Sequence, residues 1–123
     1  MSRRQAIVSF NIMEDVDLTA SAESVISNIQ NLDNIGIMIS TTGVTDNDGA
    51  FSVQVSNDKE IWATLPFTDP ITGTQVTSIA LADANEIIAL SLNQVCFTWL
   101  KLVFTDGTGT DGTVTATLSA KQL

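Results

Sequence analysis

The run Phe51-Ser52-Val53-Gln54-Val55-Ser56 decides the fold class of this chain. Its apolar and polar residues alternate strictly, which is the period of two expected of a β-strand that buries one face. Turn-forming residues bound the run on both sides, at residues 45–49 (TDNDG) and 57–60 (NDKE). We therefore predict a short, half-buried strand here and a fold made of such strands.

The same alternation occurs along the rest of the chain. Further strands are expected at residues 6–12, 35–39, 61–65 (ended by Pro66), 98–105 and 113–119. Residues 79–92 contain Ala and Glu and also fit a short helix, but we favour a strand, a loop and a second strand. Residues 106–112 (DGTGTDG) are expected to join the last two strands as a hairpin, because glycine supplies the positive φ of such turns.

These features predict an all-β fold, a single-domain antiparallel β-sandwich that is jelly-roll-like and has about seven or eight strands. A chain of 123 residues has the size of one domain. No linker or internal repeat divides it. We assign residues 5–123 to the sandwich and residues 1–4 to an N-terminal arm.

Alternation also assigns the two faces of the strand at 98–105. One face is formed by Leu100, Leu102 and Phe104, and the other by Trp99, Lys101 and Val103. A strand that is apolar on both faces lies centrally in its sheet or faces a neighbouring subunit. In the strand at 113–119 the threonines are expected on a solvated face, since β-branched residues suit an exposed pleated surface.

The chain is strongly acidic, and this limits its partners. Fourteen Asp and Glu against five Lys and Arg give a net charge of −9. Phosphate backbones are bound through clustered Lys and Arg, so we expect no direct binding to nucleic acid. No segment approaches the roughly 18–20 apolar residues of a membrane span. Since the N-terminus also lacks the apolar stretch of a signal peptide, we expect no membrane insertion, and we expect synthesis in a cytoplasm.

The residues needed for catalysis are scarce. The sequence has no His and no Tyr, which excludes serine triads and removes the commonest acid–base residue. The single cysteine, Cys96, excludes an intrachain disulfide. It lies in the apolar run 95–97, where we expect a buried core residue. No glycine-rich phosphate loop occurs, so we predict neither enzymatic activity nor a cofactor.

The acidic turn at residues 46–49 (DNDG) resembles the opening of a calcium loop, whose oxygen ligands recur at every second position. The distal Glu of such a loop is missing, because Gln54 and Val55 stand near its place. We therefore favour an ordinary Asx-type turn, and we interpret Asp106 and Asp111 in the same way. No metal site is expected.

Five residues are candidates for interactions with partners: Arg3, Arg4, Trp62, Trp99 and Val103. Trp62 and Trp99 are the only tryptophans; a place in the core (with Trp62 capping it) or at a subunit interface is favoured over a sugar-stacking platform. Arg3 and Arg4 are the only adjacent basic residues. An arm of this kind is usually solvated, and the alternative is that it binds an acidic groove on a neighbouring subunit.

Residues 28–37, and residues 49–58 followed by Trp62, resemble a pattern in small tailed-phage and related virion proteins, G-x-F-x-V-x-x-S-x-D-x-x-x-W. A strand like residues 99–104 and a closing stretch like residues 107–116 complete the pattern, which covers most of the chain. A weaker resemblance to discoidin-like sandwich modules rests on residues 53–62. The resemblance implies a β-sandwich that assembles on a particle, and it carries over no catalytic residues.

From this resemblance we expect a structural protein of a bacteriophage virion: a capsid-decorating, vertex or minor capsid component. It is expected to form a homo-oligomer and to contact other virion proteins by burying apolar strand surfaces, with Trp99 and Val103 at the contact. The alternative is a glycan- or receptor-binding module of a phage tail or fibre, with Trp62 as its platform.

Overall fold

The computed structural model describes residues 7–92, 95–109 and 111–122. These residues form twelve strands and no helix, so they contain no helix able to cross a membrane. The strands are β1 (Ile7–Asp17), β2 (Ala22–Glu23), β3 (Ser27–Asn28), β4 (Leu32–Thr42), β5 (Ala50–Ser56), β6 (Ala63–Leu65), β7 (Phe67–Thr68), β8 (Gln75–Val76), β9 (Ile79–Ala80), β10 (Ile87–Leu92), β11 (Trp99–Thr105) and β12 (Thr113–Gln122). The predicted arm at residues 1–4 lies outside the described residues.

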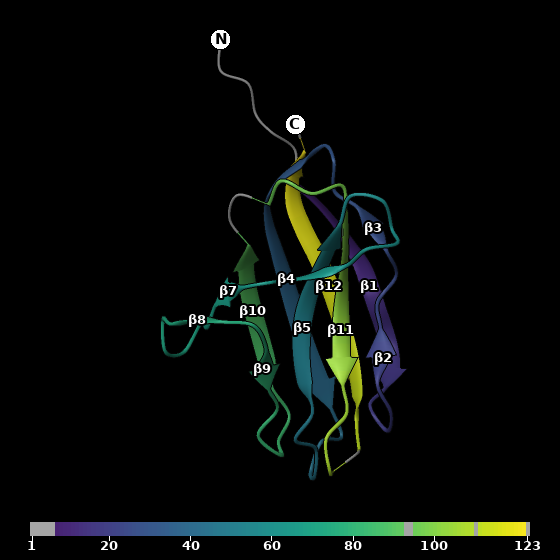
Figure 1. Cartoon of the computed structure of the whole chain (residues 1–123). Helices are drawn as coiled ribbons and strands as arrows, with labels where there is room; N and C mark the ends of the chain where they lie inside the picture. The colour runs from purple at the N-terminus through teal and green to yellow at the C-terminus, as the bar shows by residue number, and fades with distance from the viewer. Residues whose placement is uncertain (1–6, 93–94, 110, 123) are drawn as a thin grey trace.

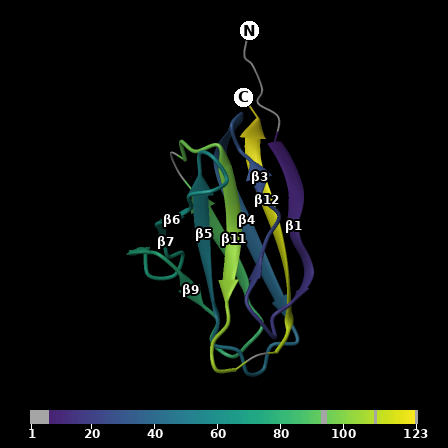
Figure 2. The ribbon, with the colours of Figure 1, turned by 45° about the vertical axis from the view of Figure 1, so that its right-hand side comes forward.

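Two antiparallel sheets form the sandwich. Sheet A has the strand order β1-β12-β4-β10. In sheet B, β11 lies between β5 and the short strands β2 and β3, and β5 also pairs with β6 and β9. Figures 1 and 2 show β5 and β11 lying over β4 and β12. The described chain begins and ends at the same end of the sandwich, where Ile7 pairs with Lys121.

The strand order confirms the predicted jelly-roll-like sandwich. β2 and β3 share one position beside β11, and β6 and β9 share one beside β5, so the two sheets have eight strand positions. The chain changes sheet after β1, β3, β4, β9, β10 and β11, which is the winding of a jelly roll. The hairpin β7–β8 interrupts the position shared by β6 and β9, and it forms a small separate sheet.

The core lies between the sheets and is supplied by alternate residues of the long strands. The inward side chains include the predicted Leu100, Leu102 and Phe104 of β11, all fully buried. Phe104 stands opposite Phe51 in the β5–β11 register, and the two ring centroids are 5.0 Å apart. Tilted aromatic pairs at this distance add about 0.5–1.5 kcal/mol to the gain from burial.

The predicted hairpin at residues 106–112 is wrong. β11 belongs to sheet B and β12 to sheet A, where β12 pairs with β1 and β4. The segment is therefore a crossover between sheets, with Thr110 outside the described residues. Both edges of β11 are already occupied by β5 and by β2 and β3, so no edge is left for β12.

The predicted burial of Cys96 is also wrong. The residue is exposed, and Phe97 beside it is 37% exposed. Residues 95–98 are not a strand; they belong to the connection from β10 in sheet A to β11 in sheet B. An apolar run of three residues was too short to distinguish a core strand from a connection.

Other strand predictions hold with small shifts. Residues 79–92 form β9, a loop and β10, as favoured. β6 begins at Ala63, so Trp62 precedes the strand. In β1 the simple alternation fails, because the β1–β12 register shifts between Asn11 and Met13, and Ile12 and Met13 are both buried.

Among the described residues, Asn47 is the one fully buried polar side chain of the loops that close the end of the sandwich opposite the termini. Its amide donates to the carbonyl oxygens of Leu18 (3.3 Å) and Asp111 (2.9 Å), and its side-chain oxygen accepts from the N–H of Gly49 (2.9 Å). Three loops are thus joined through one side chain.

We predict that Asn47→Ala lowers the free energy of unfolding by about 2–4 kcal/mol, because it leaves these buried backbone groups without partners. Urea denaturation measures the change. The exposed Asn57 is the matched control, and Asn57→Ala should change stability by less than about 0.5 kcal/mol. Equal stability of the two variants would contradict the role of Asn47.

Candidate functional site

The outer face of β11 holds the predicted interaction residues. Trp99 and Val103 are half-buried there, and Lys101 between them is only 8% exposed. Because β11 is central in sheet B, neighbouring strands support this face on both sides. The predicted division of β11 into two faces is confirmed.

Lys101 is held by two partners. Its Nζ lies 3.0 Å from the carboxylate of Glu23 on β2, the salt bridge found among the described residues. The same Nζ lies 4.4 Å from the ring centroid of Trp62. A buried ammonium without such partners is costly, so the ion pair and the ring together permit a lysine in the middle of the sheet.

The turn between β5 and β6 places a second cation and a second ring on this face. Lys59 adopts a left-handed conformation with φ 65°, and its Nζ lies 3.9 Å from the ring centroid of Trp99. The indole N–H of Trp62 donates to the Lys59 carbonyl (3.1 Å). The carboxylate of Asp58 accepts from the N–H groups of Ile61 and Glu60, both at 2.9 Å. These hydrogen bonds, with one from the Ser56 hydroxyl, lower the pKa of Asp58.

The two tryptophans flank Ser56 in one row across sheet B. Trp99 pairs with Ser56, and the pairing of Val55 with Ala63 places Trp62 on the other side of Ser56. The backbones of the two tryptophans are thus about two strand spacings apart, roughly 10 Å. Neither tryptophan is in the core, so Trp62 does not cap it. Trp62, Trp99, Lys59, Lys101 and Val103 form what we call the Trp–Lys face.

The β4–β5 and β11–β12 loops contain the acidic residues that resemble part of a calcium loop. They lie at the end of the sandwich opposite the termini (Figure 1). The Asp111 carboxylate accepts from the Thr45 hydroxyl (2.6 Å) and from the N–H groups of Thr45 and Asp46 (3.1 Å). The Asp48 carboxylate accepts from the N–H of Gly109 (3.0 Å) and the Thr108 hydroxyl (2.8 Å). The acids therefore join the loops to one another.

The predicted Asx turn at residues 46–49 is present, whereas Asp106 and Asp111 accept hydrogen bonds from other loops and form no Asx turn. The N–H of Gly49 donates to the Asn47 side chain, which is the hydrogen bond of an Asx turn. The hydroxyl of Thr45 lowers the pKa of Asp111, and the N–H of Gly109 lowers that of Asp48. Within the described ranges, no group of three or more acidic, His or Cys side chains is arranged to hold a metal ion.

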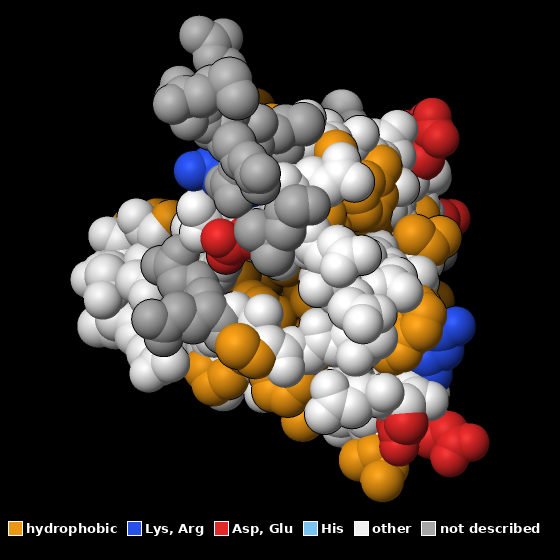
Figure 3. All heavy atoms as spheres, turned by 90° about the horizontal axis from the view of Figure 1, so that it is seen from above, with side chains coloured by type: hydrophobic (Ala, Val, Ile, Leu, Met, Phe, Trp, Pro, Cys, Tyr) orange, Lys and Arg blue, Asp and Glu red, His pale blue; other side chains and the backbone are white. Residues whose placement is uncertain are grey.

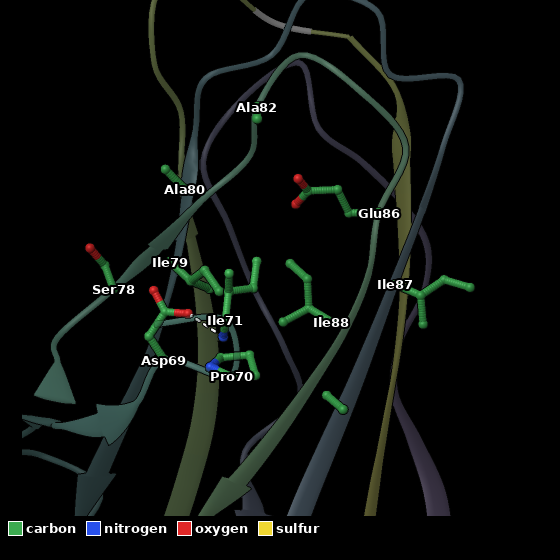
Figure 4. Close-up of a pocket in the computed structure, with 11 residues that line it drawn as sticks. Asp69, Pro70, Ile71, Ser78, Ile79, Ala80, Ala82, Glu86, Ile87 and Ile88 are labelled. Atoms are coloured by element: carbon green, nitrogen blue, oxygen red, sulfur yellow. Dashed lines mark hydrogen bonds between the residues drawn. The ribbon is translucent and has the colours of Figure 1, made fainter. Parts of the chain in front are cut away.

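The sequence did not predict a groove of about 610 Å³ between the β7–β8 hairpin and β10. Figure 4 shows Ile71, Ile79 and Ile88 converging in it, with Glu86 at one side and the Asp69 carboxylate bonded to the Ile71 N–H. Ile71 and Ile87 are 87% and 77% exposed. This exposure depends on which strand lies at the edge of a sheet, and the sequence does not show which strand that is.

The remaining candidate residues are dispersed. Arg3 and Arg4 lie outside the described residues, and the exposed Cys96 is in the β10–β11 connection. Viewed from the end where the termini lie, charged side chains occur as small separate groups among polar and hydrophobic ones (Figure 3).

No protein-family model matches this sequence, and no curated protein matches it either. Among solved structures, the SPBc2 prophage-derived protein YomS superposes with a TM-score of 0.75 at 12% sequence identity. The match covers 98% of this chain and 96% of YomS. The two proteins share a fold.

Two further solved structures match more loosely. A structure of Bacillus endospore appendages, described as disulfide-linked pili, gives a TM-score of 0.45 at 13% identity, covering 98% of this chain and 92% of that one. A structure of infectious bursal disease virus, Gx strain, gives 0.48 at 14% identity, covering 98% of this chain and 34% of that one. These two scores are too low to establish a common fold.

We predict that the stability contributed by Asp48, Asp58 and Asp111 depends on pH. Their pKa values lie below the usual 3.8, so the contribution is complete above that pH and is lost as the pH falls through the lowered values. Asp111→Asn should lower the thermal midpoint at pH 7, and the difference from the wild type should shrink towards pH 2. Thermal unfolding followed by circular dichroism measures both.

Glu60→Gln, at an exposed position of the β5–β6 turn, is the control and should leave the midpoint unchanged. A difference for Asp111→Asn that is the same at pH 7 and pH 2 would argue against an ionised acceptor. A rise in the midpoint on adding calcium would argue against the turn interpretation.

Proposed function

We propose that this protein is a non-enzymatic structural subunit of a phage particle: a capsid-decorating, vertex or other minor capsid component. Its partners are further copies of itself and other virion proteins, and its location is the virion. The observation that carries the proposal is the Trp–Lys face, an aromatic contact surface on a domain with little catalytic equipment. The fold shared with a prophage-derived protein supports the same class.

The Trp–Lys face has the composition of a protein contact. Tryptophan is enriched among the residues that contribute most to binding, and Trp99 and Trp62 are held by Lys59 and Lys101 before any partner arrives. Ordered side chains lose little conformational entropy on binding. Glu23 already neutralises Lys101 at the centre of the Trp–Lys face. An apolar partner surface placed on this face therefore buries no unpaired charge there.

The chemistry of the carboxylates supports a non-enzymatic role. A general acid needs a raised pKa, but the shifts of Asp48, Asp58 and Asp111 are all downward. These carboxylates accept hydrogen bonds from loop N–H groups, which fixes the loops. With neither His nor Tyr in the sequence, proton transfer has few candidate groups. The net charge of −9 disfavours contact with the genome.

A second candidate is a glycan- or receptor-binding module of a phage tail or fibre. Two indole rings on one sheet face can each stack on a sugar ring. The specific observation in its favour is that Trp62 and Trp99 flank the same residue, Ser56, with polar Lys59 and Glu23 nearby.

We predict that the wild-type protein is larger than a monomer and that Trp99→Ala shifts it to a smaller species at equal concentration. The truncation removes the largest apolar group of the contact, while the core behind β11 stays intact. Native mass spectrometry gives the mass, and circular dichroism checks the fold. Val103→Asp should have the same effect by placing a charge on the contact.

Ile71→Ala is the matched control, since Ile71 is more exposed than either residue and lies on the β7–β8 turn. An unchanged mass for both folded variants would exclude the Trp–Lys face as the contact. Saturable binding on a glycan array that is lost in Trp62→Ala, without any change of mass, would favour the second candidate instead.

A further inference from the structure

The groove between the β7–β8 hairpin and β10 combines apolar walls with two acids. Asp69 and Glu86 are half-buried and line it together with Ile71, Ile79 and Ile88 (Figure 4). The Glu86 carboxylate has no hydrogen-bond or ion-pair partner among the described residues, and only the backbone of this residue is bonded. None of the described residues that line the groove is basic. An occupant that brings positive charge and an aliphatic surface therefore fits it.

One wall of the groove is an open edge of sheet A. β10 pairs with β4, and no other described strand pairs with it. The Thr41 N–H donates to the Glu86 carbonyl oxygen (3.0 Å), which makes these two residues a hydrogen-bonded pair. In antiparallel pairing such pairs alternate with pairs whose backbone groups point away, so the N–H and C=O of Ile87 and Ala89 point outwards. Both residues line the groove, so a strand lying there can pair with this edge.

The two edges of sheet A differ in how they are protected. The β4–β10 register has no shift, and no residue of β10 is charged. β1, at the other edge, has two register shifts and carries Glu14, Asp15 and Asp17. Bulges and charged side chains are the usual means by which an edge strand avoids pairing with another chain. They are present in β1 and absent from β10, so β10 is the edge suited to an added strand.

The N-terminal arm carries positive charge that matches the groove. The chain has five Lys and Arg. Lys59 and Lys101 lie against the tryptophan rings, and Lys121 lies on β12. Arg3 and Arg4 are the other two. An arginine covers apolar surface with its aliphatic stem while its guanidinium binds a carboxylate, which is what isoleucine walls with two acids require.

We propose that residues 2–6 of one copy lie in this groove of a neighbouring copy, as a strand added to the edge of β10. Arg3 and Arg4 then lie beside Asp69 and Glu86. Main-chain hydrogen bonds to β10 supply affinity in such an arrangement, and the side chains supply specificity. This inference rests on the proposed function, because it names a contact between copies of the self-assembling subunit.

The register shows why the groove belongs to a neighbouring copy. β1 and β10 are the opposite edges of sheet A, three strand spacings apart (Figure 1). Ile7 stands level with Asp33 in the β1–β12–β4 register, whereas Glu86 stands opposite Thr41, eight positions further along β4. These spacings place Glu86 roughly 30 Å from Ile7. The four residues from Arg3 to Ile7 span at most about 14 Å, so a chain cannot place its own arm along β10.

Disulfide cross-linking between copies tests the proposal, in a Cys96→Ser background. One protein carries Ala89→Cys at the edge of β10, and the other carries a cysteine near the N-terminus, Ser2→Cys or Gln5→Cys. We expect at least one of the two mixtures to give about ten times more linked dimer than the same N-terminal variant mixed with Asn57→Cys protein, because binding raises the effective concentration. Asn57 and Ala89 are both exposed, so Asn57→Cys is a matched control for random collision.

Charge reversal tests the part played by the arginines. Arg3→Glu/Arg4→Glu in the N-terminal variant, or Glu86→Arg in the Ala89→Cys protein, should each lower the yield at least about threefold at low salt. Combining the two reversals should restore part of the yield. Glu60→Arg, the same change of charge at an exposed position outside the groove, should leave it unchanged. Circular dichroism checks the fold of each variant, and a yield that neither reversal lowers would overturn the proposal.

The outcomes separate this inference from the proposed function. If native mass spectrometry shows a wild type larger than a monomer but neither mixture links above the control, the groove contact fails and the proposed function stands. If a protein with both cysteines in one chain links only within that chain, the copy-to-copy contact likewise fails. Charge-dependent linking between copies of a wild type that is otherwise a monomer would keep the groove contact and overturn the stable assembly.

Discussion

Every strand of a sandwich must bury one face, and the alternation of side chains leaves the other face outside. This constraint is clearest in β11, where Leu100, Leu102 and Phe104 fill the core. Phe104 meets Phe51 of the neighbouring strand, where β5 begins and β11 ends. The residues between the core positions are then fixed on the outer face, and the candidate contact surface follows from the same alternation as the core.

The outer faces of the two sheets carry different kinds of side chain. Sheet B carries the Trp–Lys face, in which each lysine lies against a tryptophan ring and Lys101 also meets Glu23. The outer face of sheet A carries mostly small polar side chains around the exposed Met38.

Several of the acidic side chains have structural roles. Asp48 and Asp111 accept hydrogen bonds from N–H groups of neighbouring loops, and Asp58 shapes the turn that positions Lys59. The same loops contain the buried Asn47, which joins three of them. Loop closure by carboxylates explains why an acidic, glycine-rich turn can resemble a calcium loop while its oxygens already have partners.

The sequence by itself determined the long strands and, outside β1, their two faces, because alternation is local: residues 51–56 and 99–105 indicate which side chains face the core without knowledge of any neighbour. It also placed Trp99 and Val103 on one outward face. Only the tertiary structure decided that residues 106–112 cross between sheets, that Cys96 is exposed, and that Trp62 lies over Lys101. Each of these depends on which strands pair across long stretches of chain, and pairing is set by the packing of the whole sandwich, which no local pattern contains.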